Sequence, residues 1–334
     1  MRIAVTGSIA TDHLLEFPGR FADQLVAGQL ARVSLSFLAD RLDVRRGGVA
    51  ANICYGLAGL GLSPVLVGAA GADFAEYGGR LRAAGVDTDS VRISTSLHTA
   101  RFVCTTDADQ NQIATFYAGA MAEAREIDLA AVATRTGGLD LVLIGADDPE
   151  AMLRHTAAAH RLGIPVAADP AQQLARLDRA QTRLLVSGAR WLFTNAYEAA
   201  LLEERTGWSA EELRARVGTW LTTLGDEGVG VTRAGGPPLR IPAVPTRAAA
   251  DPTGAGDAFR AGFLAGLAWG WPAARAARLG CALATVALES IGTQEYRPVP
   301  EDLVARIGEA YGAEAAHAAR PRLAGTAAAP VGTA

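Results

Sequence analysis

The chain has 334 residues and a formal net charge of −4, and all 31 of its basic side chains are arginine because it contains no lysine. A Walker-A phosphate loop, a Schiff-base enzyme and a protein-kinase site each need a lysine, so these chemistries are excluded. The negative charge argues against a nucleic-acid partner or an anionic membrane surface. No stretch reaches about 18 uninterrupted apolar residues, so we expect no membrane span.

Short apolar runs alternate with helical stretches along most of the chain. We predict strands over residues 3–5, 64–67, 140–144, 165–168 and 191–193, and helices over 50–60, 74–84, 149–162, 178–186, 254–269, 272–289 and 300–311. The strands are apolar without alternation, as in parallel strands covered on both faces. This pattern predicts a doubly wound α/β fold, with a mostly parallel sheet flanked by helices.

Two predicted strand pairs interrupt this alternation, 33–37 with 42–45 and 99–105 with 112–117. We expect a small β-sheet that forms a lid over a cleft, or an edge extension without a gating role. The predicted large domain comprises 1–12, 47–96 and 118–317, the lid 13–46 and 97–117, and a disordered tail 318–334. An exposed edge of the lid sheet favours pairing between two copies, which predicts a homodimer.

The three cysteines, Cys54, Cys104 and Cys281, are far apart in the sequence. Their spacing matches neither a zinc site nor a disulfide framework. We therefore expect a protein of the reducing cytoplasm.

The segment Asp251-Pro-Thr-Gly-Ala-Gly-Asp257 precedes a long helical run. Its proline and small residues break the chain before the helix, so the free N–H groups of Gly254, Ala255 and Gly256 form an anion site. Without lysine, phosphate must be held by these amides, the helix dipole, arginine and a metal ion. Asp257 is placed to accept a proton from an attacking hydroxyl. The alternative is a helix-start carboxylate beside a small-residue packing face.

This segment resembles the C-terminal signature of the ribokinase-like (phosphofructokinase-B) carbohydrate and nucleoside kinases. Arg46-Gly-Gly-Val-Ala-Ala-Asn52 is similar to their N-terminal signature. The similarity covers residues 1 to about 311 and is greatest to bacterial adenosine kinases of the ribokinase type, over 5–13, 33–37, 99–107 and 289–295. The resemblance implies ATP-dependent phosphorylation of the 5′-hydroxyl of adenosine, giving AMP and ADP. A ribose-type sugar or another purine nucleoside is the alternative substrate.

The resemblance also assigns roles at the sugar. Asp257 would be the general base, since a loose phosphoryl-transfer transition state needs little early deprotonation of the nucleophile. Asp12 and Asn52 would hold the ribose hydroxyls. Gly48 would let the backbone approach the sugar, with Ser8 on the first strand beside it. The alternatives are a helix cap for Ser8 and Asp12, and a turn for Asn52.

Two aromatic side chains on the second lid hairpin, Phe102 and Phe116, would sandwich the purine, or they only pack the lid. By the same resemblance, Ser36, Gln172 and Gln173 approach the nucleoside. Arg176, three residues after Gln173, is a candidate for a phosphate or the ribose.

Further motifs point to ATP and its metal ions. By resemblance, Asn195 faces the nucleotide phosphates and Glu198 positions Mg²⁺ through water, although Asn-x-x-Glu is also a common helix start. By the same resemblance, the ATP ribose and phosphate edge is expected at Thr223, Gly225 and Gly228, with Gly256 also binding ATP. A monovalent cation such as K⁺ is expected at Asp251, Thr253, Ser290 and Gly292.

Two alternative functions, a dehydrogenase and a non-catalytic regulator, fit the sequence less well. A nicotinamide dehydrogenase would need a Gly-x-Gly-x-x-Gly run after the first strand, which the sequence lacks. A non-catalytic nucleotide-binding regulator would not need the base, yet Asp257 is present.

Overall fold

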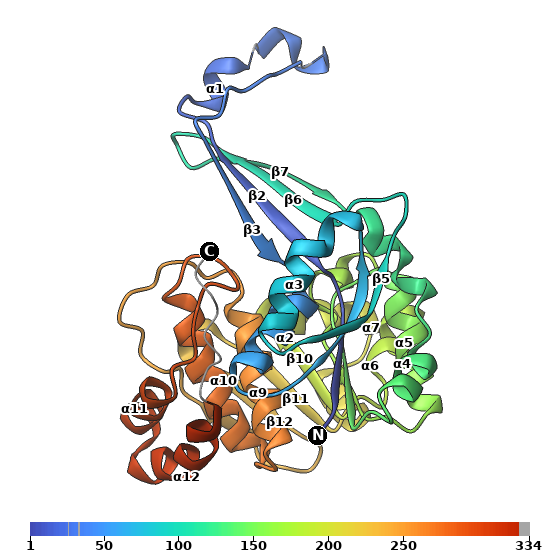
Figure 1. The fold of residues 1–334 in the computed structure, drawn as a ribbon, viewed down its shortest axis with the longest axis vertical. Helices are drawn as coiled ribbons and strands as arrows, with labels where there is room; N and C mark the ends of the chain where they lie inside the picture. Colours follow the sequence, from blue (N-terminus) through green and yellow to red (C-terminus); the bar gives the residue numbers. More distant parts are fainter. Residues whose placement is uncertain (26, 33, 327–334) are drawn as a thin grey trace.

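The structure is a computed structural model that describes residues 1–25, 27–32 and 34–326. A helix-covered body carries a narrow sheet that projects from one end (Figure 1). Among the described helices, none is long and apolar enough to cross a membrane. All three cysteines are buried as free thiols.

A nine-stranded sheet forms the centre of the body, in the order β13-β12-β11-β10-β9-β8-β1-β4-β5. The strands from β11 to β5 are parallel, and β12 and β13 extend one edge by antiparallel pairing. The bounds are β1 Ile3–Thr6, β4 Val65–Ala70, β5 Asp87–Ile93, β8 Leu141–Ile144, β9 Val166–Ala168, β10 Trp191–Asn195, β11 Thr219–Thr223, β12 Val229–Thr232 and β13 Leu239–Ile241. The predicted doubly wound architecture is confirmed.

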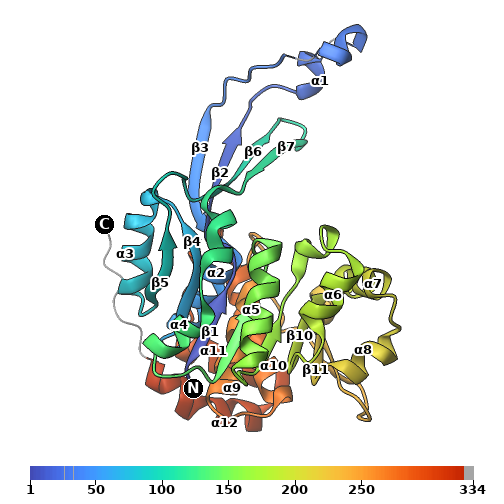
Figure 2. The ribbon, with the colours of Figure 1, turned by 90° about the vertical axis from the view of Figure 1, so that its right-hand side faces the viewer.

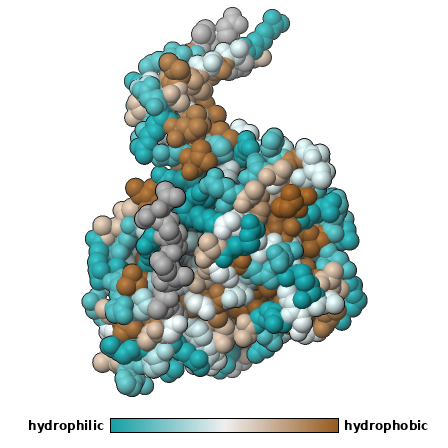
Figure 3. Space-filling model, in the orientation of Figure 1, coloured by the Kyte–Doolittle hydropathy of each residue, from teal (hydrophilic) through white to brown (hydrophobic). Residues whose placement is uncertain are grey.

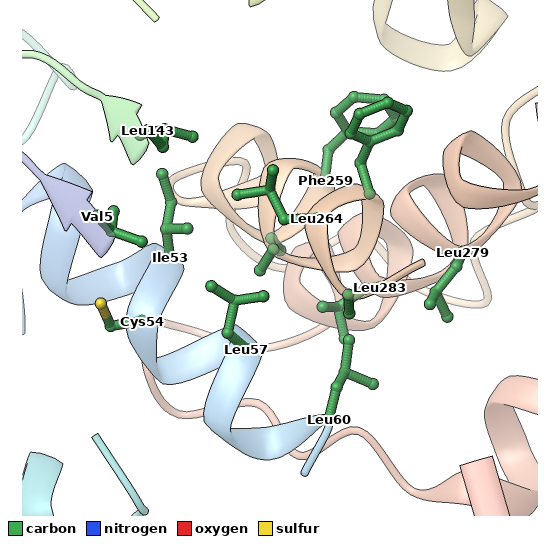
Figure 4. Close-up of a cluster of buried hydrophobic side chains, with 14 of the residues drawn as sticks. Val5, Ile53, Cys54, Leu57, Leu60, Leu143, Phe259, Leu264, Leu279 and Leu283 are labelled. Atoms are coloured by element: carbon green, nitrogen blue, oxygen red, sulfur yellow. The ribbon is translucent and has the colours of Figure 1, made fainter. Parts of the chain in front are cut away.

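Two hydrophobic cores lie on opposite faces of this sheet. Ile3 and Val5 of β1 pack into one core with α2, α9 and α10, whereas Ala4 packs into the other with α4, α5 and α6 (Figures 2 and 4). The helix bounds on the first face are α2 Val49–Gly59, α3 Ala75–Ala83, α9 Ala255–Ala268, α10 Ala273–Leu288 and α11 Pro300–Tyr311. Those on the second are α4 Leu129–Arg135, α5 Pro149–Arg161, α6 Arg179–Val186, α7 Ala196–Thr206 and α8 Ala210–Arg216.

The projecting sheet has four strands in the order β3-β2-β6-β7. They are β2 Ala10–Glu16, β3 Arg41–Gly47, β6 Ala100–Thr106 and β7 Gln112–Tyr117. The predicted β6–β7 pair is confirmed, but the strand expected over 33–37 is wrong, because residues 34–37 form no strand; residue 33 lies outside the described residues. The partner of β3 is β2, which starts only three residues after β1 ends.

Residues between β2 and β3 form an arm beyond the small sheet. It contains α1 Phe21–Gln24 and a 3-10 segment, Ala27–Arg32, and stands away from the body (Figures 1 and 2). Phe17, Phe21 and Phe37 pack against one another with ring centroids 4.9 to 5.8 Å apart. Apolar surface gathers on the small sheet and at the base of this arm (Figure 3).

The C-terminal region corrects a second expectation. Residues 318–323, predicted to belong to a disordered tail, lie in helix α12, Ala313–Leu323, and a 3-10 turn follows over Ala324–Thr326. Ala319 and Leu323 are buried in the same core as α9 and α10. Ala315 and Ala316 also pack against this core, so the alanine-rich helix docks through four apolar side chains. The rest of the predicted tail, residues 327–334, lies outside the described residues.

Candidate active site

A pocket of about 830 Å³ opens where the carboxyl ends of β9, β10 and β11 meet the start of α9. The carboxyl ends of parallel strands are where doubly wound sheets bind ligands. Its polar wall comes from the strand ends and the first turn of α9. Its apolar wall comes from the segment after β13 and from α10, with Ala243, Val244, Pro245, Cys281, Ala284 and Leu288. An apolar slot beside a helix N-terminus suits a nucleoside phosphate.

The start of α9 builds the anion-binding part of the pocket. Gly254 is the N-cap residue and has φ of +82°, a left-handed conformation that favours glycine. Gly254, Ala255, Gly256 and Asp257 all line the pocket. The positive end of a 14-residue helix therefore points into the pocket at the residues predicted from the sequence.

Asp257 lies at the inner wall of the pocket. Its Oδ2 accepts a hydrogen bond from Nδ2 of Asn52 at 2.8 Å. Burial raises the pKa of Asp257 to about 6, against the lowering effects of the Arg260 charge and the Asn52 hydrogen bond. Within the described part of the chain, no hydrogen bond occupies the other oxygen, Oδ1. This carboxylate is thus oriented through one oxygen and open through the other.

Sequence reasoning missed a buried ion pair in the same wall. Arg260, one turn after Asp257, contacts both oxygens of Asp169 at 2.5 and 2.6 Å and donates to the carbonyl of Gly256 at 2.9 Å. Its charge also faces Glu198. The sequence feature that indicates this pair is an arginine within the apolar run 258–265, because a charged side chain buried in a helix requires a partner.

Asn195 and Thr223 are register partners at the ends of β10 and β11 and both line the pocket. The Asn195 side chain accepts from the Glu198 N–H at 2.7 Å, and Oε2 of Glu198 accepts from the Asn195 N–H at 2.8 Å. These two bonds form a capping box at the start of α7. The hydrogen bonds of Asn195 and Glu198 are therefore those of a common helix start, the alternative that the sequence offered. Glu198 also lines the pocket, and burial raises its pKa. Gly225 and Gly228 complete this edge.

One face of the small sheet carries three of the predicted substrate residues, Asp12, Phe102 and Phe116, in a single row with Arg45. Arg45, Asp12, Phe102 and Phe116 are direct register partners across β3, β2, β6 and β7, so their side chains share a face. Burial raises the pKa of Asp12 to about 6, Arg45 lowers it and Asp251 raises it. The row therefore faces the body of the protein at the loop of Asp251.

Asn52 lies in the second turn of α2 and is buried, so it is not a turn residue. Gly48, which we expected to admit a sugar, has φ of +96°, and a Cβ there would lie 2.6 Å from the backbone of Ser8 and Ala10. The backbone at residue 48 passes so close to residues 8 and 10 that glycine is required there even without a bound sugar. Ser8 is buried, and its hydroxyl accepts from the Val49 N–H at 3.0 Å, so it caps α2.

Several predicted residues lie apart from the pocket. Ser36 is exposed in the arm and Arg176 is exposed beyond Ala171–Ala175, and neither lines the pocket. Gln172 does line it, whereas Gln173 is buried with no hydrogen bond to its Oε1.

The predicted K⁺ residues lie on two adjacent segments. The carboxylate of Asp251 joins them by accepting from the N–H of Thr253 at 2.9 Å and of Gly292 at 3.0 Å. Ser290 instead bonds to the Val286 carbonyl in α10. Across the described ranges, no group of three or more acidic, histidine or cysteine side chains is arranged to hold a metal ion.

Comparisons with known proteins agree with this architecture. The family model of pfkB family carbohydrate kinases matches residues 13–301. A nucleoside kinase of Methanothermobacter thermautotrophicus is 32% identical over 271 residues, 80% of this chain and 86% of the relative. A ribokinase of Thermotoga maritima, 22% identical, shares the fold with a TM-score of 0.75 over 92% of this chain and 99% of its own.

The structure of Burkholderia thailandensis nucleoside kinase in complex with inosine has a TM-score of 0.82 and 34% identity, and covers 93% of this chain and 99% of its own. The same enzyme in complex with ADP-inosine gives a TM-score of 0.79 and 35% identity, over 93% and 96%. With a family model that spans most of the sequence and a ribokinase-like fold, the chain belongs to the pfkB family of carbohydrate kinases.

Proposed function

We propose that this protein is an ATP-dependent nucleoside kinase that phosphorylates the 5′-hydroxyl of a purine nucleoside, giving a nucleoside monophosphate and ADP. The observation that carries the proposal is the position of Asp257, a carboxylate with one free oxygen, in the first turn of a helix that points into the pocket. The nucleoside kinases among its relatives and structural neighbours support the same substrate class.

In the proposed reaction, Oδ1 of Asp257 takes the proton of the attacking hydroxyl. The oxygen of that hydroxyl bonds to the γ-phosphorus as the bond to the β–γ bridging oxygen breaks, and ADP leaves with the bridging oxygen. The transition state is loose, so positioning and charge stabilisation dominate the rate. Backbone amides from Gly254 to Gly256 stabilise the transferring group.

The oxygen donors at the end of β10 fit a magnesium ion that accompanies ATP. Glu198 is a carboxylate on the pocket wall beside Asn195, and Mg²⁺ prefers oxygen ligands and retains water. When bound, the ion neutralises charge on the β- and γ-phosphates. We assign Glu198 to hold it through water, and Asn195 and Thr223 to the phosphates.

On the nucleoside side, Asp12 and Asn52 hold the ribose hydroxyls, and Phe102 with Phe116 form the platform for the purine. The resemblance to adenosine kinases favours adenosine, and the inosine complexes of a structural neighbour support another purine nucleoside equally. A coupled assay of ADP release with adenosine, inosine, guanosine and ribose tests both the substrate class and the preferred base. Faster turnover of ribose than of every nucleoside would reject the nucleoside kinase. The ratio of the turnover rates with adenosine and inosine decides which purine base the enzyme prefers.

Two further assignments accompany this function. We place the monovalent cation at the loops of Asp251, Thr253, Ser290 and Gly292, which an activity titration with KCl in place of NaCl tests. We also propose that two copies associate through the small sheet, as a homodimer. Its face opposite to Asp12 carries exposed apolar side chains, including Leu42 and Val44 on β3 and Ile113 and Tyr117 on β7. Light scattering that reports a monomer at micromolar concentration would contradict the dimer.

A further inference from the structure

A chain of buried polar side chains connects the end of strand β3 to Asp257. The hydroxyl of Tyr77 donates to the carbonyl of Gly47 at 2.9 Å. Nε2 of Gln294 lies 2.5 Å from that hydroxyl and 2.8 Å from Oδ1 of Asn52. Nδ2 of Asn52 then donates to Oδ2 of Asp257 at 2.8 Å. The side chains between the two ends, Tyr77, Gln294 and Asn52, are at most 5% exposed.

The carbonyl of Gly47 fixes the direction of every hydrogen bond in this chain. A carbonyl only accepts, so the Tyr77 proton is committed to it and the lone pairs of that hydroxyl face Gln294. Gln294 must therefore present its NH₂ group, and its second N–H goes to the oxygen of Asn52. Asn52 in turn must present its NH₂ group to Asp257. Each amide has two possible orientations, and the anchor at Gly47 selects one of them.

The carboxylate of Asp257 supports the same orientation of Asn52. The hydroxyl of Thr293 lies 2.9 Å from both Oδ1 of Asn52 and the carbonyl of Arg46, so its single proton can go to only one of these acceptors and does not fix the amide. A reversed Asn52 amide would turn its oxygen toward the carboxylate of Asp257, where two acceptors would face each other. Gly47 is the last residue of β3, so the anchor of the network belongs to the small sheet.

On the basis of the proposed kinase function, we propose that Tyr77 and Gln294 are positioning residues for the catalytic base. They hold the Asn52 amide so that Oδ2 of Asp257 is bonded and Oδ1 is left for the substrate hydroxyl. Both side chains reach Asp257 only through the Asn52 amide. Because the anchor is on β3, the alignment of Asp257 depends on the position of the small sheet.

Two substitutions break the network with little change in packing. Tyr77→Phe removes the hydroxyl and keeps the ring that packs on Phe74, with ring centroids 5.4 Å apart. Gln294→Met removes both N–H donors from a side chain of similar length. The matched control is Tyr296→Phe, because Tyr296 is buried as deeply and its hydroxyl has no hydrogen-bond partner.

We expect Tyr77→Phe and Gln294→Met each to lower kcat about tenfold, the size of one lost hydrogen bond at the transition state, and to leave the KM for ATP within about twofold. Tyr296→Phe stays within about twofold of wild type in both constants. The double variant Tyr77→Phe with Gln294→Met should lose no more than the more damaging single variant, since the two side chains act in series.

A second readout does not depend on the substrate. The carboxyl carbon signal of Asp257 is titrated in ¹³C-aspartate-labelled protein and identified by its loss in Asp257→Asn. The groups that face Asp257 are Arg260 on its own helix, Asn52 on α2, Asp169 after β9 and the Tyr296 hydroxyl. Since the Asn52 hydrogen bond lowers the pKa of Asp257, Tyr77→Phe and Gln294→Met should raise the titration midpoint, and Tyr296→Phe should not.

The outcomes separate the two proposals. Wild-type protein that phosphorylates no nucleoside rejects the proposed function, and the titration then decides the positioning role alone. A midpoint that stays unchanged in both Tyr77→Phe and Gln294→Met overturns the positioning role. Equal loss of kcat in Tyr77→Phe and Tyr296→Phe, or additive losses in the double variant, overturns it as well.

Discussion

The amide of Asn52 lies 2.8 Å from the carboxylate of Asp257, although 205 positions separate the two residues in the chain. The contact depends on the packing of α2 against α9, where Ile53 and Leu57 share a core with Phe259 and Leu264 (Figure 4). This packing therefore holds the Asn52 amide, the group proposed to bind the sugar, beside the proposed base Asp257.

Asp257→Asn should lower kcat by about 10²- to 10⁴-fold, because it removes the proton acceptor from an otherwise unchanged pocket. ATP affinity, measured by calorimetry, should stay within about twofold. Asp226→Asn is the matched control, since Asp226 is another carboxylate on the wall of the same pocket. Normal turnover by Asp257→Asn would mean that the base lies elsewhere.

Activity should fall as the pH drops through about 6, because the pKa of Asp257 is raised to about 6 and only its ionised form accepts a proton. The pKa of Asp12 is raised to about 6 as well. The pH dependence of kcat is therefore measured in wild type and in Asp12→Asn. The acid limb should persist in Asp12→Asn, and a wild-type midpoint near 4 would contradict the assignment.

Phe116→Ala should raise the nucleoside KM by about 5- to 150-fold, the equivalent of a base-stacking energy of roughly 1–3 kcal/mol, and leave the KM for ATP unchanged. Phe116 is 51% exposed on the face of the small sheet that carries Asp12. Tyr117→Ala removes an exposed ring from the opposite face and serves as the control. Similar effects of the two substitutions would assign both rings to packing or association.

Glu198→Gln should separate helix capping from metal binding. Glutamine also serves at the third position of a capping box, so the free energy of unfolding should change by less than about 0.5 kcal/mol. The Mg²⁺ concentration for half-maximal activity should rise about 10- to 100-fold, as for a ligand that acts through water. Glu212→Gln makes the same change in the capping box of α8 and should alter neither quantity. An unchanged Mg²⁺ dependence in Glu198→Gln would leave this glutamate a purely structural role.

Asp169→Asn should destabilise the fold by about 3–5 kcal/mol in denaturant unfolding, because it leaves the buried guanidinium of Arg260 without its counter-charge. The exposed pair of Arg20 and Asp109 provides the comparison. Asp109→Asn should cost less than about 1 kcal/mol, since water screens this pair. Comparable losses in the two variants would show that Arg260 is solvated.

Most of the body could be predicted from the sequence because its strands are short, continuous apolar runs, such as Leu141–Ile144, that only a covered parallel sheet accommodates. Local turn chemistry likewise located the start of α9. The strand β2 was missed because Ala10–Glu16 carries polar and charged side chains, and its partners lie far away in the chain. Pairing that depends on distant segments leaves little local pattern.

The candidate site divides in the same way. Asp257, Asn195 and Thr223 belong to strand ends and helix starts, which local patterns mark, and they meet at one pocket. Asp169 and Tyr77 carry no such mark, because their importance comes from partners that only the fold brings near. Ser36 was placed near the nucleoside through a strand that does not form.

Three residues separate β1 from β2, and Gly48 lies tightly against Ser8 and Ala10 where the small sheet leaves the body, so we expect any rotation of the sheet to pivot at this point. Asp12 lies two residues beyond this pivot, whereas Phe116 is two strands further across, on the order of 10 Å away. A rotation of the sheet would hardly move the first and would sweep the second through an arc. We therefore expect the sugar to be recognised in every position of the sheet, and the base to be selected only as it closes.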